Sequence, residues 1–174
     1  MAHHQMELER EIDGLRRYAR LLSKNWNDAD DLVQECLLRA LEKWPRIAGV
    51  EDLRRYLFSM LHNLFIDGVR KTGRRGKVVP IETAMMAPAL VQGENQDHRL
   101  ELQDLSDGLD SLPDAQREVV LLVGMAGFTY EEAAKITNCP VGTVMSRLSR
   151  GRKVLRDYVP GDTVDPAPMQ QLTR

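Results

Sequence analysis

Apolar residues recur at spacings of three and four through much of this chain, which is the pattern of helices with one buried side. Six segments show it: residues 7–24, 28–44, 53–71, 97–109, 114–125 and 130–158. The stripe is sharpest in the second segment, where it consists of Leu32, Val33, Cys36, Leu37, Ala40, Leu41 and Trp44. Residues 78–96 hold two prolines and a glycine without a clear period. The pattern therefore predicts an all-α protein of two small helical domains joined by a flexible linker.

The strongest local signals lie between residues 128 and 158. Thr129 and Glu132 have the capping-box spacing, in which a hydroxyl and a carboxylate satisfy backbone N–H groups at a helix start. A helix should therefore begin at about Tyr130. Asn138 tolerates the left-handed conformation that a sharp helix stop requires, and Pro140 permits a new helix but cannot extend the old one. This stretch is predicted to form a helix, a tight turn and a second helix.

The second of these helices has one apolar side and one polar side. Its inward positions recur at helical spacing: Val141, Val144, Leu148 and Leu155. Hydroxyl and cationic groups are left facing outward: Thr143, Ser146, Arg147, Arg150 and Lys153. Such groups contact phosphates and guanine edges in a DNA major groove, so the layout fits a helix-turn-helix whose second helix reads DNA. An ordinary amphipathic hairpin with a solvated basic side fits the same pattern nearly as well.

Charge is distributed unevenly along the chain, although the formal net charge is only −2. Residues 1–77 hold 15 basic against 12 acidic side chains, residues 78–116 hold one against eight, and residues 117–158 hold seven against four. Two mildly basic blocks thus flank an acidic connector. This favours two domains that face a polyanion, joined by a segment that repels it. Two ordinary domains with a solvated linker would give the same totals.

Several classes of protein are disfavoured. No apolar run approaches the length of a membrane span, and the polar, acidic N-terminus does not resemble a secretory signal, so we expect a cytoplasmic protein. Cys36 and Cys139 are too isolated for a disulfide framework or a zinc site. The four histidines form no metal-ligand or triad-like pattern, and no glycine-rich phosphate loop is present. We therefore expect no metal, no cofactor and no enzymatic activity.

Segment 53–71 combines aromatic rings with a basic end. The rings belong to Tyr56, Phe58 and Phe65. The segment runs into five cations: Arg70, Lys71, Arg74, Arg75 and Lys77. Unpaired bases stack on rings while their phosphates meet cations, so this segment suits single-stranded nucleic acid. Membership of the core, with the basic end as a linker, is the better explanation for at least two of the three rings.

Three stretches, in order, resemble the successive signatures of the extracytoplasmic-function (ECF) sigma factors of the sigma-70 family, the smallest bacterial promoter-recognition subunits. They are DADDLVQECLLRAL, YLFSMLHNLFIDGVRK and LPDAQREVVLLVGMAGFTYEEAAKITNCPVGTVMSRLSRGRKVLR. The similarity covers roughly residues 10–158, and three motifs in the family's order make it specific. The last motif, with GFTYEEAA and VGTVMSRLSR, is most similar to the general-stress branch of alphaproteobacteria.

The resemblance implies a domain organisation. Residues 1–77 would form a region 2-like domain that binds core RNA polymerase and the −10 promoter element, and residues 78–110 a linker. Residues 111–159 would form a region 4-like helix-turn-helix domain that binds the −35 element. The tail, residues 160–174, has three prolines and no pattern, and is predicted to be disordered.

The resemblance also assigns roles to individual residues. Four residues of segment 28–44 would dock on the clamp helices of the largest polymerase subunit: Asp31, Gln34, Glu35 and Leu38. Three residues would line a pocket for an extruded −10 base: Trp44, Met60 and Asn63, with the Asn63 amide reading a base edge. Holding an extruded base favours strand opening. The implied partners are core polymerase, including the flap region of its second-largest subunit, promoter DNA and an anti-sigma factor.

Two positions depart from the family pattern. Family members commonly carry Lys or Arg where this chain has Met145, which leaves Ser146, Arg147 and Arg150 as the main expected contacts with the −35 element. Gly151 stands where Ala is usual, and should weaken its helix by about 1 kcal/mol at most.

The expected function is that of a sigma factor, monomeric when free, which directs bacterial RNA polymerase to specific promoters, assists initiation and is controlled by an anti-sigma factor. An ordinary helix-turn-helix repressor should bring a dimerisation or ligand domain, and neither is visible. A sigma-like decoy, which binds an anti-sigma factor but no DNA, would sit beside a receiver domain of about a hundred residues. The chain has no room for one, which favours the sigma factor.

Overall fold

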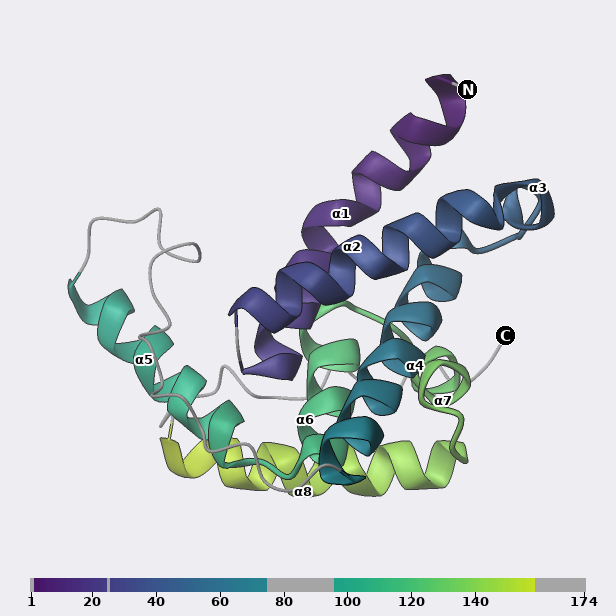
Figure 1. The fold of residues 1–174 in the computed structure, drawn as a ribbon. Coiled ribbons are helices and arrows are strands. Elements are labelled where there is room, and N and C mark those ends of the chain that lie inside the picture. The colour runs from purple at the N-terminus through teal and green to yellow at the C-terminus, as the bar shows by residue number, and fades with distance from the viewer. Residues whose placement is uncertain (1, 25, 75–95, 159–174) are drawn as a thin grey trace.

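The computed structural model describes residues 2–24, 26–74 and 96–158, and every regular element in these residues is a helix (Figure 1). The first half contains α1 (Ala2–Ser23), α2 (Trp26–Glu42), α3 (Trp44–Ile47) and α4 (Leu53–Arg74). The second half contains α5 (Gln96–Ser111), α6 (Asp114–Val120), the π-helical segment η1 (Leu121–Met125), α7 (Tyr130–Thr137) and α8 (Val141–Tyr158). The predicted all-α class is confirmed.

The first half is built around the contacts of α1 and α4 with α2. Its core is made of inward-facing side chains that are fully or almost fully buried: Leu15, Leu22, Val33, Cys36, Leu57 and Leu61. Leu41 was predicted to share this core, but it is 50% exposed, so that prediction is wrong. A helix advances 100° per residue, which puts Leu41 closer to the side of Gln34 and Leu38 than to that of Cys36. Leu41 therefore adds apolar surface to the outside of α2.

The predicted helix-turn-helix is confirmed in detail. The backbone N–H of Glu132 donates to Thr129 Oγ1 at 3.2 Å, and the backbone N–H of Thr129 donates to Glu132 Oε2 at 2.8 Å. These two bonds form the capping box that starts α7. At the other end of α7, Asn138 adopts the left-handed conformation with φ 49°. The chain then turns through Pro140, and α8 begins at Val141.

The helix predicted over residues 114–125 changes character halfway. It is α-helical to Val120, and then a π-helix from Leu121 to Met125. The backbone N–H of Ala126 donates to the Leu121 carbonyl at 2.9 Å, which is the i→i+5 bond of a π-helix. Gly127 follows with φ +72°, a conformation that glycine adopts without steric cost. The chain thus turns from η1 into the helix-turn-helix.

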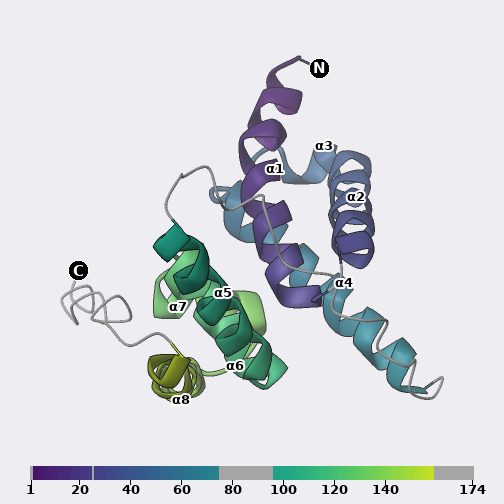
Figure 2. The same ribbon diagram turned by 90° about the vertical axis from the view of Figure 1, so that its left-hand side faces the viewer.

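The two halves pack against each other. Figures 1 and 2 show α1 to α4 on one side of the molecule and α5 to α8 on the other, with α4 beside the second half. Helix α4 packs against α7, and α1 packs against α6 and η1. Within the second half α5 contacts α8 and slants towards its C-terminal end (Figure 1). A Cβ added at Gly108 of α5 would lie 2.9 Å from Leu155 Cδ2 of α8, so these two helices approach closely. Among the residues that the structure describes, no helix has both the length and the apolar character of a membrane span.

Candidate nucleic-acid interface

Helix α8 lies along one edge of the molecule (Figure 1), and most of its outward residues are polar. Its opposite side is buried through Val144, Leu148, Gly151 and Leu155. Arg150 and Lys153 are exposed, as predicted, whereas Thr143, Ser146 and Arg147 are partly buried. The Ser146 hydroxyl donates to the Thr143 carbonyl at 3.0 Å. Arg147 lies on the flank towards the turn, where its Nη1 donates to Cys139 Sγ at 3.7 Å.

Two further residues share this polar side and were not among the sequence predictions. Met145 is 41% exposed, and Ser149 is exposed. Residues three or four apart are neighbours on a helix surface, so the spacing of Met145 and Ser149 relative to Arg150 and Lys153 was the signal that would have found them. From here the outer face of α8 means five residues: Met145, Ser146, Ser149, Arg150 and Lys153.

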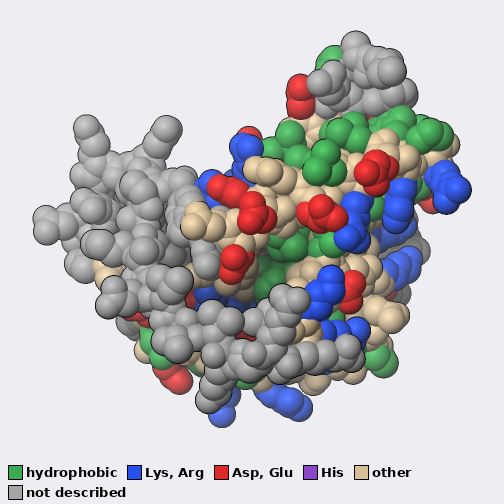
Figure 3. Space-filling model, viewed as in Figure 1, with side chains coloured by type: hydrophobic (Ala, Val, Ile, Leu, Met, Phe, Trp, Pro, Cys, Tyr) green, Lys and Arg blue, Asp and Glu red, His purple; other side chains and the backbone are tan. Residues whose placement is uncertain are grey.

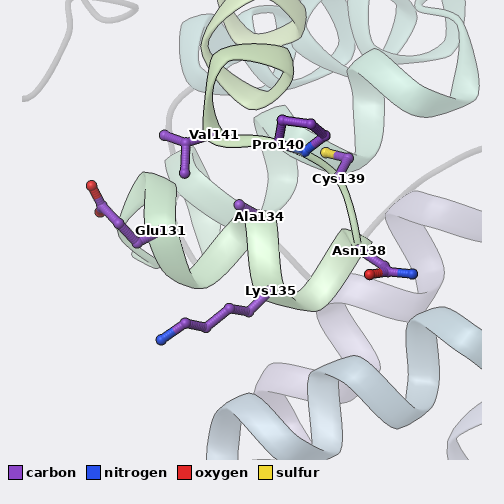
Figure 4. Close-up of a pocket in the computed structure, with 7 residues that line it drawn as sticks. All are labelled: Glu131, Ala134, Lys135, Asn138, Cys139, Pro140 and Val141. Carbon is purple, nitrogen blue, oxygen red and sulfur yellow. The ribbon is translucent and has the colours of Figure 1, made fainter.

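A shallow groove lies where α7 turns into α8 (Figure 4). It encloses about 540 Å³ and is lined by Glu131, Ala134, Lys135, Asn138, Cys139, Pro140 and Val141. Figure 4 shows Glu131 and Lys135 pointing away from the turn. The floor thus consists of small and apolar groups, with one charge of each sign at the rim. Such an open groove suits contact with a large surface better than enclosure of a small molecule.

The residues predicted for the −10 element lie in different surroundings. Asn63 is exposed on α4, Met60 is partly buried, and Trp44 is only 9% exposed at the start of α3. Arg70 and Lys71 are exposed near the end of α4. Arg74 is the last residue of α4 and its side chain is not described, and Arg75 and Lys77 lie outside the described residues. Of the three pocket residues, Asn63 therefore offers the accessible polar group.

The residues predicted to bind polymerase share one exposed side of α2, which we call the acidic face: Asp31, Gln34, Glu35 and Leu38. Figure 3 shows acidic side chains at intervals along α2. Arg39 Nε donates to Glu35 Oε1 at 2.6 Å. Leu38 is 57% exposed, and with Leu41 it gives this face an apolar part. Exposed leucines beside carboxylates are typical of a protein contact with a polar rim.

A second set of charged groups is buried between the two halves. The Tyr18 hydroxyl of α1 donates to Glu118 Oε1 of α6 at 3.3 Å, and His62 Nδ1 of α4 hydrogen-bonds to the same oxygen. Burial raises the pKa of Tyr18 well above its usual range, and the nearby Glu118 carboxylate raises it further. One carboxylate oxygen of the second half thus joins two helices of the first.

Arg117 is the other buried charge, with a side chain that is 1% exposed. Its Nε donates to the Leu109 carbonyl at 2.8 Å, its Nη2 to the Leu112 carbonyl at 2.7 Å, and its Nη1 to the Leu22 carbonyl of the first half at 3.4 Å. Burial lowers the pKa of Arg117, and the acidic neighbours Asp114 and Asp110 oppose that shift. The guanidinium therefore ties the end of α1 to the connection between α5 and α6.

Arg54 of α4 contacts the second half just before the helix-turn-helix. Its Nη2 donates to the Ala126 carbonyl at 2.6 Å, and its guanidinium carbon lies 4.8 Å from the ring centre of Phe128. The rings of Phe58 and Phe128 meet edge to face, with centres 4.9 Å apart. We call these contacts the seam, defined by Tyr18, Arg54, Phe58 and His62 of the first half and Arg117, Glu118 and Phe128 of the second. Tyr18 lies at an inward position of the apolar period over residues 7–24, but the charged members were not predicted, because nothing local distinguishes them from solvated residues.

The two thiols also differ. Cys36 is buried, and burial raises the pKa of its thiol to about 12. Cys139 is partly buried at the turn, 3.1 Å from Thr137 Oγ1. No group of three or more side chains able to hold a metal ion is found in the described part of the chain.

Comparison with known proteins finds two family models that match separate stretches of this chain. A family model described as Sigma-70 region 2 matches residues 8–75, and one described as Sigma-70, region 4 matches residues 102–155. The chain is 40% identical to the ECF RNA polymerase sigma factor EcfG of Rhodopseudomonas palustris, with 88% of each chain covered. It is 34% identical to the ECF RNA polymerase sigma factor SigC of Mycobacterium tuberculosis, with 77% of this chain and 72% of SigC covered.

Two solved structures are also similar to this chain. The sigma factor RpoE of Bartonella quintana, in complex with the anti-sigma factor NepR, matches with a TM-score of 0.81 and 35% identity, over 93% of this chain and 99% of RpoE. CnrH, in complex with the cytosolic domain of CnrY, shares the fold with a TM-score of 0.63 at 24% identity, over 88% of this chain and 84% of CnrH. With both sigma-70 regions matched in order and a relative at 40% identity, this chain belongs to the ECF RNA polymerase sigma factors, which direct bacterial RNA polymerase to promoters and assist the initiation of transcription.

Proposed function

We propose that this sigma factor contacts core polymerase through the acidic face of α2 and the −35 element through the second half, with the outer face of α8 in the major groove. Thr143 and Arg147 would add contacts from the flank. The observation that carries this proposal is the outer face itself, which combines hydroxyl and cationic groups on a helix that the capping box and Asn138 position. Helix-turn-helix proteins present such a helix to DNA.

In the first half we propose that Asn63 reads a −10 base, with Trp44 and Met60 supporting the pocket. Arg70, Lys71, Arg74 and Arg75 would meet the phosphates. Asn63 is exposed while Trp44 is buried, so an incoming base would reach Asn63 first. The chain itself would catalyse no reaction, because holding an extruded base needs only binding energy.

We assign the region 2-like domain to residues 1–77 and the region 4-like domain to the second half, connected by the linker. The region 4 match begins at residue 102, inside α5, and α5 packs against α8. Both observations support counting α5 with the region 4-like half rather than with the linker, whose predicted end was residue 110. The protein would act in the cytoplasm, where it meets the polymerase.

Binding to both promoter elements requires the seam to open. Elements centred at −10 and −35 lie about 25 base pairs apart, or about 85 Å along the duplex. A compact chain of this size has a radius of gyration of about 16 Å, so the packed halves cannot reach both elements together. The 21 residues between Arg74 and Gln96 span about 70 Å when extended. Together with the lengths of the two halves, this segment allows the opened chain to reach both promoter elements.

We propose that an anti-sigma factor binds this chain and favours the packed arrangement. The chain is 35% identical to RpoE of Bartonella quintana, whose structure was solved with the anti-sigma factor NepR. The 40% identity to EcfG supports a place in the general-stress branch. A partner that binds only the packed form stabilises it in proportion to its own affinity, and so keeps the two DNA-binding surfaces from acting together.

Run-off transcription with reconstituted core polymerase tests the −35 assignment. Arg150→Ala should lower promoter-specific transcription about tenfold, since one base or phosphate contact of this kind contributes about 1–3 kcal/mol. Arg16→Ala, at an exposed arginine of α1, is the matched control and should transcribe like the wild type. If the wild-type chain binds an anti-sigma factor but directs no transcription, the decoy function replaces this one.

A pull-down with core polymerase tests the acidic face. Glu35→Lys should reduce competition for core about tenfold, because a reversed charge faces the same partner surface. Glu9→Lys makes the same change at an exposed position of α1 and should compete normally. Equal recovery of both variants would remove α2 from the polymerase interface.

A further inference from the structure

Met145 is an exposed apolar residue on a face made otherwise of hydroxyl and cationic groups. It is the fifth residue of α8, and its side chain is 41% exposed. The first turns of a recognition helix are the part that meets base edges in helix-turn-helix complexes. Ser146, Ser149 and Arg150 surround the same outer side. The position of Met145 is therefore one from which a side chain reaches bases rather than the protein core.

The immediate surroundings of Met145 are uncharged. Its neighbours three and four residues away along the helix are Val141, Gly142, Leu148 and Ser149. A Cβ added at Gly142 would meet nothing within 4 Å, so the surface beside Met145 is open. Arg147, the nearest cation in sequence, turns to the other flank to meet Cys139. This leaves a small apolar patch at the start of the outer face.

A methionine side chain offers no hydrogen-bond donor and no charge, so it gains nothing from a phosphate or from the O6 and N7 acceptors of guanine. Thymine is the only standard base with a methyl group in the major groove. The methionine thioether is flexible and polarisable, and adapts to a methyl group without exact placement. The hydroxyls of Ser146 and Ser149 and the guanidinium of Arg150, elsewhere on the same face, are hydrogen-bonding groups that do not recognise a methyl group.

We propose that Met145 is a specificity-determining residue, which selects a thymine in the −35 element through contact with its C5 methyl group. This inference rests on the proposed function, because it requires α8 to lie in the major groove. The inference extends the proposed function by naming the base that Met145 selects, thymine, and the group of that base that it contacts, the C5 methyl. Met145 thereby contributes to promoter choice as well as to affinity.

The test begins with the holoenzyme and promoters selected from a pool randomised across the −35 element. At least one strongly preferred thymine is expected. Each thymine is then replaced by deoxyuridine, which removes only the methyl group. Wild-type holoenzyme should lose about fourfold in promoter affinity at one such position, as for one methyl-sized apolar contact. Met145→Ala holoenzyme should discriminate between thymine and deoxyuridine there by less than about 1.5-fold, because the short alanine side chain retains little of the contact.

Met125→Ala is the matched control, because Met125 is 37% exposed but lies in η1, away from α8. This variant should keep the fourfold effect of the missing methyl group. The inference is overturned if wild-type holoenzyme tolerates every deoxyuridine, if selection yields no preferred thymine, or if Met145→Ala keeps the full effect. A loss of core binding by Met145→Ala would assign the residue to the polymerase instead. Failure of wild-type holoenzyme to transcribe any selected promoter would refute the proposed function itself.

Discussion

The seam and the outer surfaces of α2 and α8 use the same kinds of residue in opposite surroundings. Arg117 and Glu118 are 1% and 5% exposed, and their charged atoms bond to groups of both halves. Arg150 of α8 and Glu35 of α2 are exposed. The first pair therefore determines how the halves sit together, while the second pair is available to partners. An arginine or a glutamate in this chain has its role set by what packs over it.

The polar character of the seam suits a contact that must separate. Burying a charge costs free energy that partners only partly return. When the halves part, Arg117 and Glu118 regain water, so opening costs less than it would for an apolar contact of equal area. Contacts between domains of one chain are commonly of this more polar kind. The seam thus combines a defined closed geometry with the ability to open.

The largest expected difference between the seam and the outer face of α8 is in the free energy of unfolding when an arginine of each is replaced. Arg117→Met should lower the free energy of unfolding by about 3 kcal/mol, because three carbonyls lose a donor and each such bond contributes about 1 kcal/mol. Arg150→Met, the same change on the outer face of α8, should alter it by less than about 0.5 kcal/mol. Urea unfolding followed by circular dichroism measures both. Equal effects would mean that Arg117 does not bond to these three carbonyls in solution.

A smaller effect is expected at the glutamates. Glu118→Gln should cost about 2 kcal/mol, since Tyr18 and His62 lose a charged acceptor. The variant should also open more readily, which small-angle scattering would detect as a larger radius of gyration. Glu35→Gln on the acidic face should change neither quantity. A compact Glu118→Gln protein of wild-type stability would contradict the importance of this carboxylate.

Alanine substitutions at two glycines of α8 should change the stability of the protein in opposite directions. A Cβ at Gly151 would lie 2.7 Å from Val120 Cγ2 of α6. Gly151→Ala should therefore cost about 1–2 kcal/mol through overpacking, despite the better helix propensity of alanine. Gly142→Ala enters open space and should stabilise by up to about 1 kcal/mol. Thermal unfolding of the two variants would show melting temperatures moved in opposite directions. A stabilised Gly151→Ala would show that α6 and α8 are not in close contact.

The weakest effect appears only at high pH. The pKa of Tyr18 is raised in the folded chain, so above about pH 10 the unfolded phenol ionises while the folded one stays neutral. This contribution to stability is complete below pH 10 and should fall by about 1.4 kcal/mol per pH unit above it. Tyr18→Phe should remove that slope, whereas Tyr158→Phe, at an exposed tyrosine, should retain it. Unfolding measured at pH 8, 10 and 11 tests the difference.

Sequence reasoning succeeded where the interactions are local. The capping box joins residues three apart, the Asn138 turn needs one tolerant residue, and the apolar stripe of α8 follows a helical period. It failed at Leu41, which the helical advance of 100° per residue places with Gln34 and Leu38 rather than with Cys36, and at η1, where an i→i+5 bond replaces the α-helical one. Gly151 was expected to be only a weak point of its helix, but it allows α8 to approach Val120.

The sequence by itself determined the helices, the helix-turn-helix and the polar side of α8, because each depends on spacing within one segment. It also determined the family, through three motifs in order. Only the tertiary structure decided that Arg117, Glu118 and His62 are buried between the two halves. The physical reason is that burial depends on which residues, often about fifty to a hundred positions away, come to cover a side chain, and helical periodicity carries no information about such partners.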